Sequence, residues 1–208
     1  MEIAVIGCGG IGSFFAMYLN RAIQTEQLPM ITNQNITLFD FDTVDNGNLM
    51  HQNFYSEEIT VHKASVLSLR YMFNARVLRF EERHLSEFDY FVICADNKAA
   101  RNIVYRHCID TGKQFLDMRS EGLNIMIFTD REDPEVLIDS LGEDKDNETG
   151  FSCRTAQDRE MGQVQMGNAV VAPMGMQVLL QQFRQEDYPA CVQENILGDR
   201  NIFFNKGV

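Results

Sequence analysis

The chain has 208 residues, of which 45% are hydrophobic and 23% charged, as in ordinary globular proteins, and we expect one domain over residues 1–208. Its net charge of −12 argues against nucleic acid as a partner. No apolar run approaches the ~20 residues that span a bilayer, and Met1 is followed at once by an apolar strand pattern, so we expect no signal peptide, no membrane partner and a cytoplasmic protein.

Five cysteines are scattered through the chain without a C-x-x-C pair: Cys8, Cys94, Cys108, Cys153 and Cys191. An odd, scattered set favours neither a disulfide framework nor a structural zinc site. Cys8, Cys94 and Cys108 lie in apolar or helical contexts, so we expect them to be small core residues.

The chain opens on a strand, a glycine-rich turn and a helix. Residues 3–6 form a short apolar run typical of a buried strand, and the first helix is predicted over 13–27. Between them, the first glycine permits a tight turn, the second lets a phosphate approach the backbone, and the last allows close packing of helix on strand. The N–H groups that open the helix would face an anion. The pattern therefore predicts nucleotide binding, with packing alone as the alternative, at Gly7, Gly9, Gly10 and Gly12.

The second strand is predicted at residues 36–39 and is followed by Asp40, Phe41 and Asp42. An acidic residue at this place can bind the two ribose hydroxyls of a nucleotide. Asp40 follows the glycines at a longer spacing than the roughly 20 residues of dehydrogenases. We therefore predict that Asp40 binds ribose, with a strand-end cap as its alternative role.

Strands and helices alternate through the remaining chain. The expected elements are helices at 64–73, 98–110 and 173–185, the last with Met174, Val178, Leu179 and Phe183 on its buried face, and strands at 77–80, 88–94, 114–117 and 124–129, with an edge strand or docking segment at 201–208. This alternation predicts an α/β fold of Rossmann-like, doubly wound type, with a mainly parallel sheet and helices on both faces.

Residues 130–168 interrupt the alternation and lead to the last helix. In residues 130–150, nine acidic residues stand against Arg131 and Lys145. We therefore expect an acidic, solvated crossover loop within the domain.

Several motifs occur in a fixed order: GCGGIGS at 7–13, LFDFDTVDNGNLMHQ at 38–52, Lys63, CADNKAARNIV at 94–104 and VAPMGMQVLLQQF at 171–183. With these motifs the chain resembles the ThiF/MoeB/HesA family of ubiquitin-activating-type adenylyltransferases. The short form, in which Ser152 and Cys153 precede an AQD sequence, is similar to the ThiF-like proteins of bacterial PRTRC plasmid systems.

The resemblance implies an enzyme that binds ATP and Mg²⁺. It would join AMP to the C-terminal carboxylate of a small ubiquitin-like protein or peptide with a glycine-rich tail, and it would release pyrophosphate. It also implies a homodimer. The chemistry of such a site consists largely of positioning and charge neutralisation.

The resemblance implies that three residues contact the phosphates of ATP. Asn48 and Gln52 match the polar residues that line the triphosphate, and either has an alternative role in loop hydrogen bonding. Lys63 matches a lysine that contacts phosphate, since an ammonium is a mobile point charge. Without the resemblance, Lys63 would be interpreted as a surface residue that opens a helix.

Asp96 matches the magnesium-associated aspartate of the family. Asn97, which follows it, and Asp42 are also expected to bind the cofactor. Carboxylate oxygen is a ligand that Mg²⁺ takes when it also keeps phosphates and water. The alternative role for Asp96 is the N-cap of the helix predicted at 98–110. Arg101, in the same motif, is expected to be structural.

The chain departs from the family pattern in three respects. His51 stands where the family usually has arginine, and a histidine is largely neutral at pH 7 whereas arginine is a permanent forked charge. Many members carry a further phosphate arginine on a helix before the first strand. Since the sequence opens on the strand, we expect this arginine to be absent or supplied differently. The zinc-binding C-x-x-C pairs of many members are missing, so we expect no zinc. These departures put catalytic activity in question.

Cys153 lies in a polar stretch beside Arg154, near the place where some family members keep a thiol that accepts the activated carboxylate. A neighbouring arginine lowers the pKa of a thiol, so the hypothesis is a catalytic or transfer role. Two other hypotheses remain open for the whole chain. One is an NAD-dependent oxidoreductase, and the other is a catalytically degenerate binding partner.

Overall fold

The computed structural model describes residues 1–142, 166–196 and 200–203. Within them, eight strands form one sheet in the order β3-β2-β1-β4-β5-β6-β7-β8. The strands β1 to β5 pair in parallel and β6 to β8 extend the sheet antiparallel. Their bounds are β1 Ile3–Ile6, β2 Ile36–Phe39, β3 Asn74–Arg76, β4 Tyr90–Ile93, β5 Gln114–Glu121, β6 Asn124–Thr129, β7 Cys191–Asn195 and β8 Arg200–Phe203.

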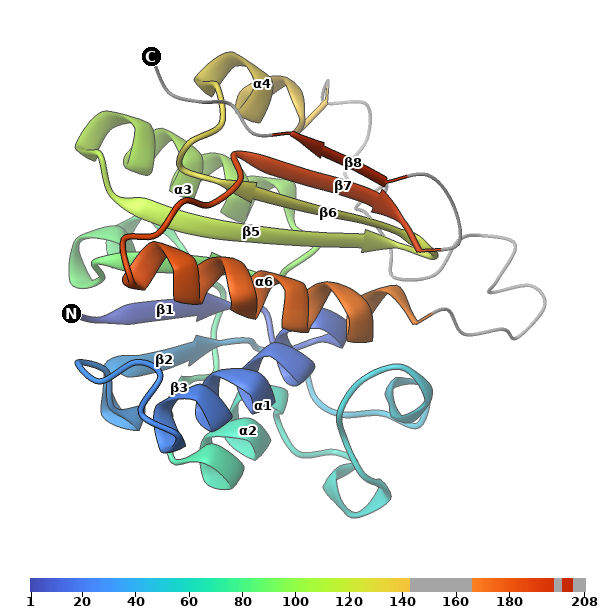
Figure 1. Ribbon diagram of the computed structural model, residues 1–208. Helices are drawn as coiled ribbons and strands as arrows, with labels where there is room; N and C mark the ends of the chain where they lie inside the picture. The colour runs from blue at the N-terminus through green and yellow to red at the C-terminus, as the bar shows by residue number, and fades with distance from the viewer. Residues whose placement is uncertain (143–165, 197–199, 204–208) are drawn as a thin grey trace.

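The helices cover both faces of the sheet, which confirms the predicted doubly wound α/β fold. They are α1 Gly10–Gln24, α2 Lys63–Tyr71, α3 Lys98–Thr111, α4 Pro134–Asp139 and α6 Gly167–Phe183. In the view of Figure 1, α1 and α6 lie in front of the sheet and α3 lies behind it. None of the described helices is long and apolar enough to cross a membrane.

Alternation along the strands divides the core into two clusters. Ile3 and Val5 face the side that carries α1, α2 and α6, whereas Ala4 and Ile6 face the side of α3 and α4. Successive side chains of a strand point to opposite faces, so a strand buried on both faces is apolar throughout. The apolar run at the start of the chain reflects this double burial.

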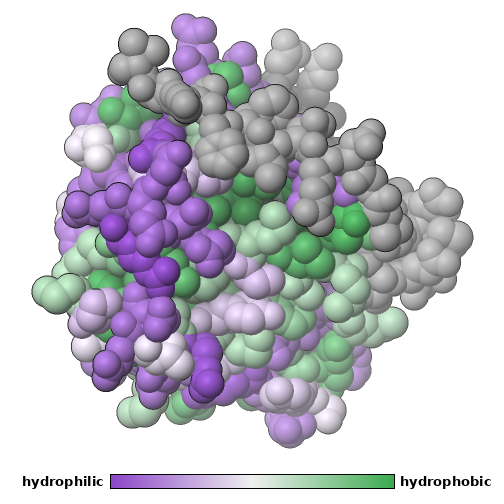
Figure 2. Space-filling model, viewed as in Figure 1, coloured by the Kyte–Doolittle hydropathy of each residue, from purple (hydrophilic) through white to green (hydrophobic). Residues whose placement is uncertain are grey.

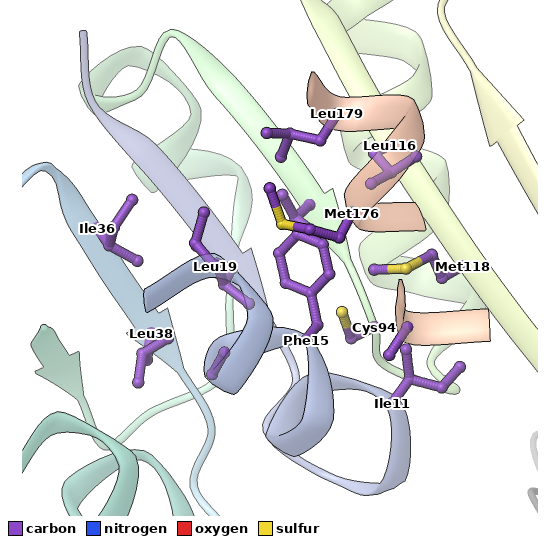
Figure 3. Packing of buried hydrophobic residues seen from close by; sticks show 14 of the residues in the cluster. Ile11, Phe15, Leu19, Ile36, Leu38, Cys94, Leu116, Met118, Met176 and Leu179 are labelled. Atoms are coloured by element: carbon purple, nitrogen blue, oxygen red, sulfur yellow. The ribbon is translucent and has the colours of Figure 1, made fainter. Parts of the chain in front are cut away.

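On the front face, α1 and α6 pack against each other over the sheet. Figure 3 shows Phe15 of α1 next to Met176 of α6, near Leu116 and Met118 of β5. The outer surface of this face also carries hydrophobic residues near its middle, and hydrophilic residues gather along its left side (Figure 2).

Cys8, Cys94 and Cys108 are buried, as predicted, and so is Cys191.

The strand predicted at 77–80 is wrong, because the strand in this region is β3, Asn74–Arg76, at the edge of the sheet. Its polar residues are largely exposed, so no apolar pattern marks it. The apolar segment that follows has left the sheet, and Phe80 packs edge-on against Phe39 with ring centroids 5.0 Å apart.

The predicted helix starts also need correction. Helix α1 begins at Gly10, so Gly10 and Gly12 belong to its first turn and the preceding tight turn is shorter than predicted. Helix α6 begins at Gly167 and contains Pro173 in its interior, where a proline removes one backbone hydrogen bond. Its buried face includes Val178 and Leu179 as predicted, whereas Met174 and Phe183 are only partly buried.

The C-terminal part of the sheet was predicted only in part. Strand β8 confirms the added strand at the end of the sheet, but β7, its partner, was missed. The acidic loop predicted over 130–150 contains a short helix, α4, which Asp133 caps by accepting from the N–H of Glu135. This helix forms because Leu137 is buried against the back face. Residues 143–165 of the crossover lie outside the described residues.

Candidate nucleotide-binding site

A cleft of about 1430 Å³ opens where β1, β2 and β4 end. The strand order reverses direction between β1 and β4, and ligands of open α/β sheets bind at this switch point, outside the carboxyl ends of the strands. Three segments far apart in sequence therefore meet there: the glycine turn after β1, Asp40 to Asp42 after β2, and Cys94 to Asn97 after β4.

At the start of the glycine turn, the backbone of Gly7 packs against the backbone of Ala95, and at its middle Gly9 borders open space. Gly7 has φ of +93°, and a Cβ on it would lie 2.7 Å from the backbone nitrogen of Ala95, so a side chain there would be strained and would clash. Gly9 lines the cleft, and a Cβ on it would meet nothing within 4 Å. Gly9 is also the N-cap of α1 and offers no side-chain cap, so the first N–H groups of α1 lack a side-chain acceptor from the cap.

Gly10 and Gly12 allow α1 to pack closely. A Cβ on Gly12 would lie 2.0 Å from the carbonyl oxygen of Gly7, and one on Gly10 would lie 2.1 Å from the side-chain nitrogen of Asn168. The packing role predicted for Gly12 is therefore confirmed. Phosphate binding at Gly7, Gly9 and Gly10 stays a prediction.

We expect Gly12→Ala to affect mainly stability and Gly9→Ala to affect mainly binding. The methyl of Gly12→Ala overlaps backbone that cannot move without shifting α1 against β1, so the free energy of unfolding should fall by about 2–3 kcal/mol or more. Gly9→Ala should cost far less stability and should lower ATP affinity, because its methyl points into open space in the cleft. Urea unfolding and ATP titration measure the two quantities. Equal destabilisation by both changes would contradict the packing described here.

Asp40 ties the end of β2 to the glycine turn. Its carboxylate accepts from the N–H of Cys8 at 2.6 Å and from the N–H of Asp42 at 2.8 Å. Burial raises the pKa of Asp40, while these two bonds and the charge of Lys63 oppose the rise. A carboxylate accepts about four hydrogen bonds, so two acceptor sites remain for hydroxyl groups. The strand-end cap and the predicted ribose contact are thus compatible roles.

Lys63 is buried, so its interpretation as an ordinary surface residue is wrong. It is the first residue of α2 and 6% exposed. Its ammonium lies 3.5 Å from a carboxylate oxygen of Asp42 and lines the cleft. A buried ammonium has three donors to satisfy, and this single long ion pair accounts for one of them.

The structure brings Gln52 to the cleft but does not bring Asn48 there. The buried Oε1 atom of Gln52 has no hydrogen-bond partner in the described part of the chain. Its Nε2 atom lies 3.5 Å from Nε2 of His51, and His51 is not among the residues that line the cleft. The side chain of Asn48 accepts from the N–H of Asp45, and the Asp45 carboxylate accepts from the N–H of Asn48. Asn48 therefore has the local loop role that was its alternative.

The N-cap of α3 is Asn97 and not Asp96. The Asn97 side chain accepts from the N–H groups of Ala99 and Ala100 at 2.9 and 3.4 Å. Asparagine is as good a cap as aspartate, and its position directly before Lys98 decides the matter. Asp96 lines the cleft with an exposed carboxylate, which is left available for a ligand.

A basic lining of the cleft was not recognised from the sequence. Three acidic residues, Asp40, Asp42 and Asp96, stand against six basic residues: Lys63, Arg79, Lys98, Arg101, Arg106 and Arg119. The four arginines come from three parts of the chain, with Arg79 in a loop, Arg101 and Arg106 on α3 and Arg119 on β5, so no single signal in the sequence groups them. The cleft is thus basic in a chain of net charge −12.

Two residues of this lining, Arg101 and Arg119, belong to a buried ionic network. Asp117 of β5 accepts from Nε of Arg101 at 3.1 Å and from Nε of Arg119 at 2.8 Å, and Tyr105 donates to it. Burial alone would raise the pKa of Asp117, but the two guanidinium groups hold it below its ordinary value. The structural role expected of Arg101 is therefore confirmed, and the network holds α3 against the sheet beside the cleft.

The described residues contain no group of three or more His, Cys, Asp or Glu side chains that could hold a metal ion. Asp96, with an exposed carboxylate, fits the case in which Mg²⁺ is bound through one carboxylate together with phosphates and water. Cys153 lies outside the described residues.

The fold and the position of the cleft define an α/β protein of Rossmann-like type with its ligand site at the switch point. A sequence model described as the ThiF family matches residues 1–198. The chain belongs to the ThiF family.

Solved structures share the fold at low sequence identity. Escherichia coli MccB with AMPCPP and MccA has a TM-score of 0.68 and 15% identity over 98% of this chain and 63% of that chain. MccB with ATP has a TM-score of 0.65 at 14% identity over 97% and 63%. The E. coli tRNA N6-threonylcarbamoyladenosine dehydratase TcdA has a TM-score of 0.62 at 16% identity over 88% and 86%. The chain thus spans about three fifths of the MccB chains. The comparison with curated proteins gives no match.

Proposed function

We propose that the chain is an adenylyltransferase that binds ATP in the cleft and joins AMP to a carboxylate. The observation that carries the proposal is the excess of basic over acidic side chains around a glycine turn, in a chain that is otherwise strongly acidic. Polyphosphate is the ligand that this charge pattern suits. Membership of the ThiF family and the ATP in the MccB structure support the choice of ATP.

The residues of the cleft then have distinct roles. The free acceptor sites of Asp40 bind the ribose hydroxyls, and the open backbone at Gly9 admits a phosphate. Lys63 and Gln52 would contact the phosphates, and Asp96 would hold the Mg²⁺ that accompanies them. Bound Mg²⁺ would neutralise charge on the phosphates. His51 stands where the family has arginine but does not line the cleft, so this position supplies no permanent charge to the phosphates, which predicts weak activity.

The proposed acceptor is the C-terminal carboxylate of a small ubiquitin-like protein or peptide with a glycine-rich tail. Attack of a carboxylate oxygen on the α-phosphorus forms the acyl-adenylate, and pyrophosphate leaves with the electron pair of the broken bond. The MccA in complex with MccB supports a second macromolecule at such a site. A homodimer and a transfer role for Cys153 belong to the same proposal.

The test compares ATP with NAD. We expect Mg²⁺ with ATP at a hundredfold excess over its Kd to raise the melting temperature by about 5–10 °C, because a ligand that binds only the folded state adds about 2.7 kcal/mol. NAD should raise it less. The chain should also exchange labelled pyrophosphate into ATP when a carboxylate substrate is present. Stronger stabilisation by NAD would favour an oxidoreductase instead.

A further inference from the structure

Two buried polar side chains beside the glycine turn have no hydrogen-bond partner among the described residues. They are Asn168, 2% exposed, and Ser120, 3% exposed. Both atoms of the Asn168 amide, Nδ2 and Oδ1, lack a partner, and so does the hydroxyl of Ser120. No sequence pattern pointed to either residue.

The two residues lie where α1, α6 and β5 converge. The amide of Asn168 packs on the backbone of Gly10, since a Cβ there would meet its Nδ2 at 2.1 Å. The hydroxyl of Ser120 packs on Gly167 in the same way, at 2.2 Å, and Ser120 also lines the cleft. Neither α1 nor α6 has a side-chain cap or an acidic residue in its first turn. Ser120 therefore lies at the wall of the cleft, and Asn168 packs behind it against Gly10, which also lines the cleft.

Packing alone does not account for these side chains. A buried donor or acceptor without a partner costs about 1–3 kcal/mol, and an apolar residue of similar size would avoid the cost. Other buried polar side chains, such as Gln182 and Thr129, are bonded: Gln182 bonds Phe115 and Asp130, and Thr129 bonds Pro189. Within the described residues, Oε1 of Gln52 also lacks a partner, and Gln52 lines the cleft. The unpaired atoms of Asn168 and Ser120 point to a ligand that completes their hydrogen bonds.

The chemistry of the pair selects the ligand. An asparagine amide offers a donor and an acceptor side by side, and an extended peptide presents the N–H and the C=O of one residue on the same side. A carboxylate or a fully ionised phosphate has no donor and would leave Oδ1 of Asn168 unpaired. We propose that Asn168 and Ser120 bind the last peptide group of the substrate tail, so that the terminal carboxylate lies beside the glycine turn. This inference rests on the proposed adenylation and adds a requirement for a peptide bond next to the carboxylate.

The experiment uses the full chain with Mg²⁺ and ATP and two pools of random heptapeptides with free C-terminal carboxylates. In the second pool the last peptide nitrogen is methylated, which removes the donor that Oδ1 of Asn168 would accept. Peptide-dependent exchange of pyrophosphate into ATP is measured with both. We expect methylation to lower exchange by the wild-type chain about 10-fold, the size of one buried hydrogen bond.

The variants separate recognition from folding. Asn168→Ala and Ser120→Ala should lower exchange with the unmethylated pool about 10-fold, and in Asn168→Ala methylation should have little further effect, since both changes remove the same contact. Ser68→Ala is the control, because this hydroxyl of α2 donates to the carbonyl oxygen of Phe73 and neither residue lines the cleft. It should keep the full methylation effect. Stabilisation by Mg²⁺ and ATP should persist in all three.

Two results would overturn the inference in different ways. If the wild-type chain accepts both pools equally, or if Asn168→Ala keeps the full methylation effect, the peptide subsite is wrong and the adenylation proposal stands. If Mg²⁺ and ATP bind but neither pool supports exchange, adenylation of peptides is wrong and the subsite fails with it.

Discussion

Asp96→Ala should lower substrate-dependent pyrophosphate exchange at least ~100-fold and leave the chain folded. The carboxylate is the proposed ligand of the Mg²⁺ that offsets charge on the departing pyrophosphate, and loss of one such contact typically has this effect. Stability should hardly change, because Asp96 is exposed and the cap of α3 is Asn97. The loss of stability that would follow if Asp96 were the N-cap is therefore not expected.

Asp110→Ala is the matched control for this change. Asp110 is an exposed carboxylate near the other end of α3 and does not line the cleft, so exchange should stay at the wild-type rate. Equal rates in the wild-type chain and Asp96→Ala would end the magnesium assignment. A melting temperature lowered by Asp96→Ala as much as by Asn97→Ala would show that Asp96 also caps the helix.

Lys63→Met should weaken ATP binding roughly 10- to 100-fold, since hydrogen bonds to charged groups contribute about 1.5–3 kcal/mol. The free energy of unfolding should stay constant or rise. A buried ammonium with a single ion pair at 3.5 Å gains little to offset its desolvation, and methionine fills a similar volume. The Asp42 carboxylate left behind is half exposed and remains hydrated. Isothermal titration with ATP and urea unfolding give the two values.

Arg21→Met serves as the control, because Arg21 is an exposed cation in the last turn of α1 away from the cleft. Its ATP affinity should equal that of the wild-type chain. Large destabilisation by Lys63→Met without loss of ATP affinity would show that the buried lysine is structural and that the phosphates are held elsewhere.

Sequence reasoning found the parts of the site that short, contiguous stretches of sequence specify. The glycine turn, Asp40 and Asp96 each follow directly on a buried strand, so a short apolar run followed by a turn or an acid was enough to place them at the carboxyl edge of the sheet. Errors occurred where local chemistry is ambiguous. Asp96 and Asn97 are both good caps, and only the start of α3 decides between them.

The basic wall of the cleft and the pair Asn168 and Ser120 had no local signal. Arg79, Arg119 and Ser120 come from a loop and from β5, and α6 brings Asn168 to Gly10 across a separation of more than 150 residues in the chain. Whether such a side chain finds a partner is a property of the packed interior. Sequence patterns carry no information about it.

The sequence by itself determined the α/β class, the parallel strands and the place of the glycine turn, because strands buried on both faces must be apolar and the turns between them need particular residues. Only the tertiary structure decided that Lys63 is buried, that Asn48 bonds within its own loop, and that two buried polar side chains lack partners. These outcomes depend on contacts between distant segments, and such contacts form only when the helices α1 and α6 pack on the sheet.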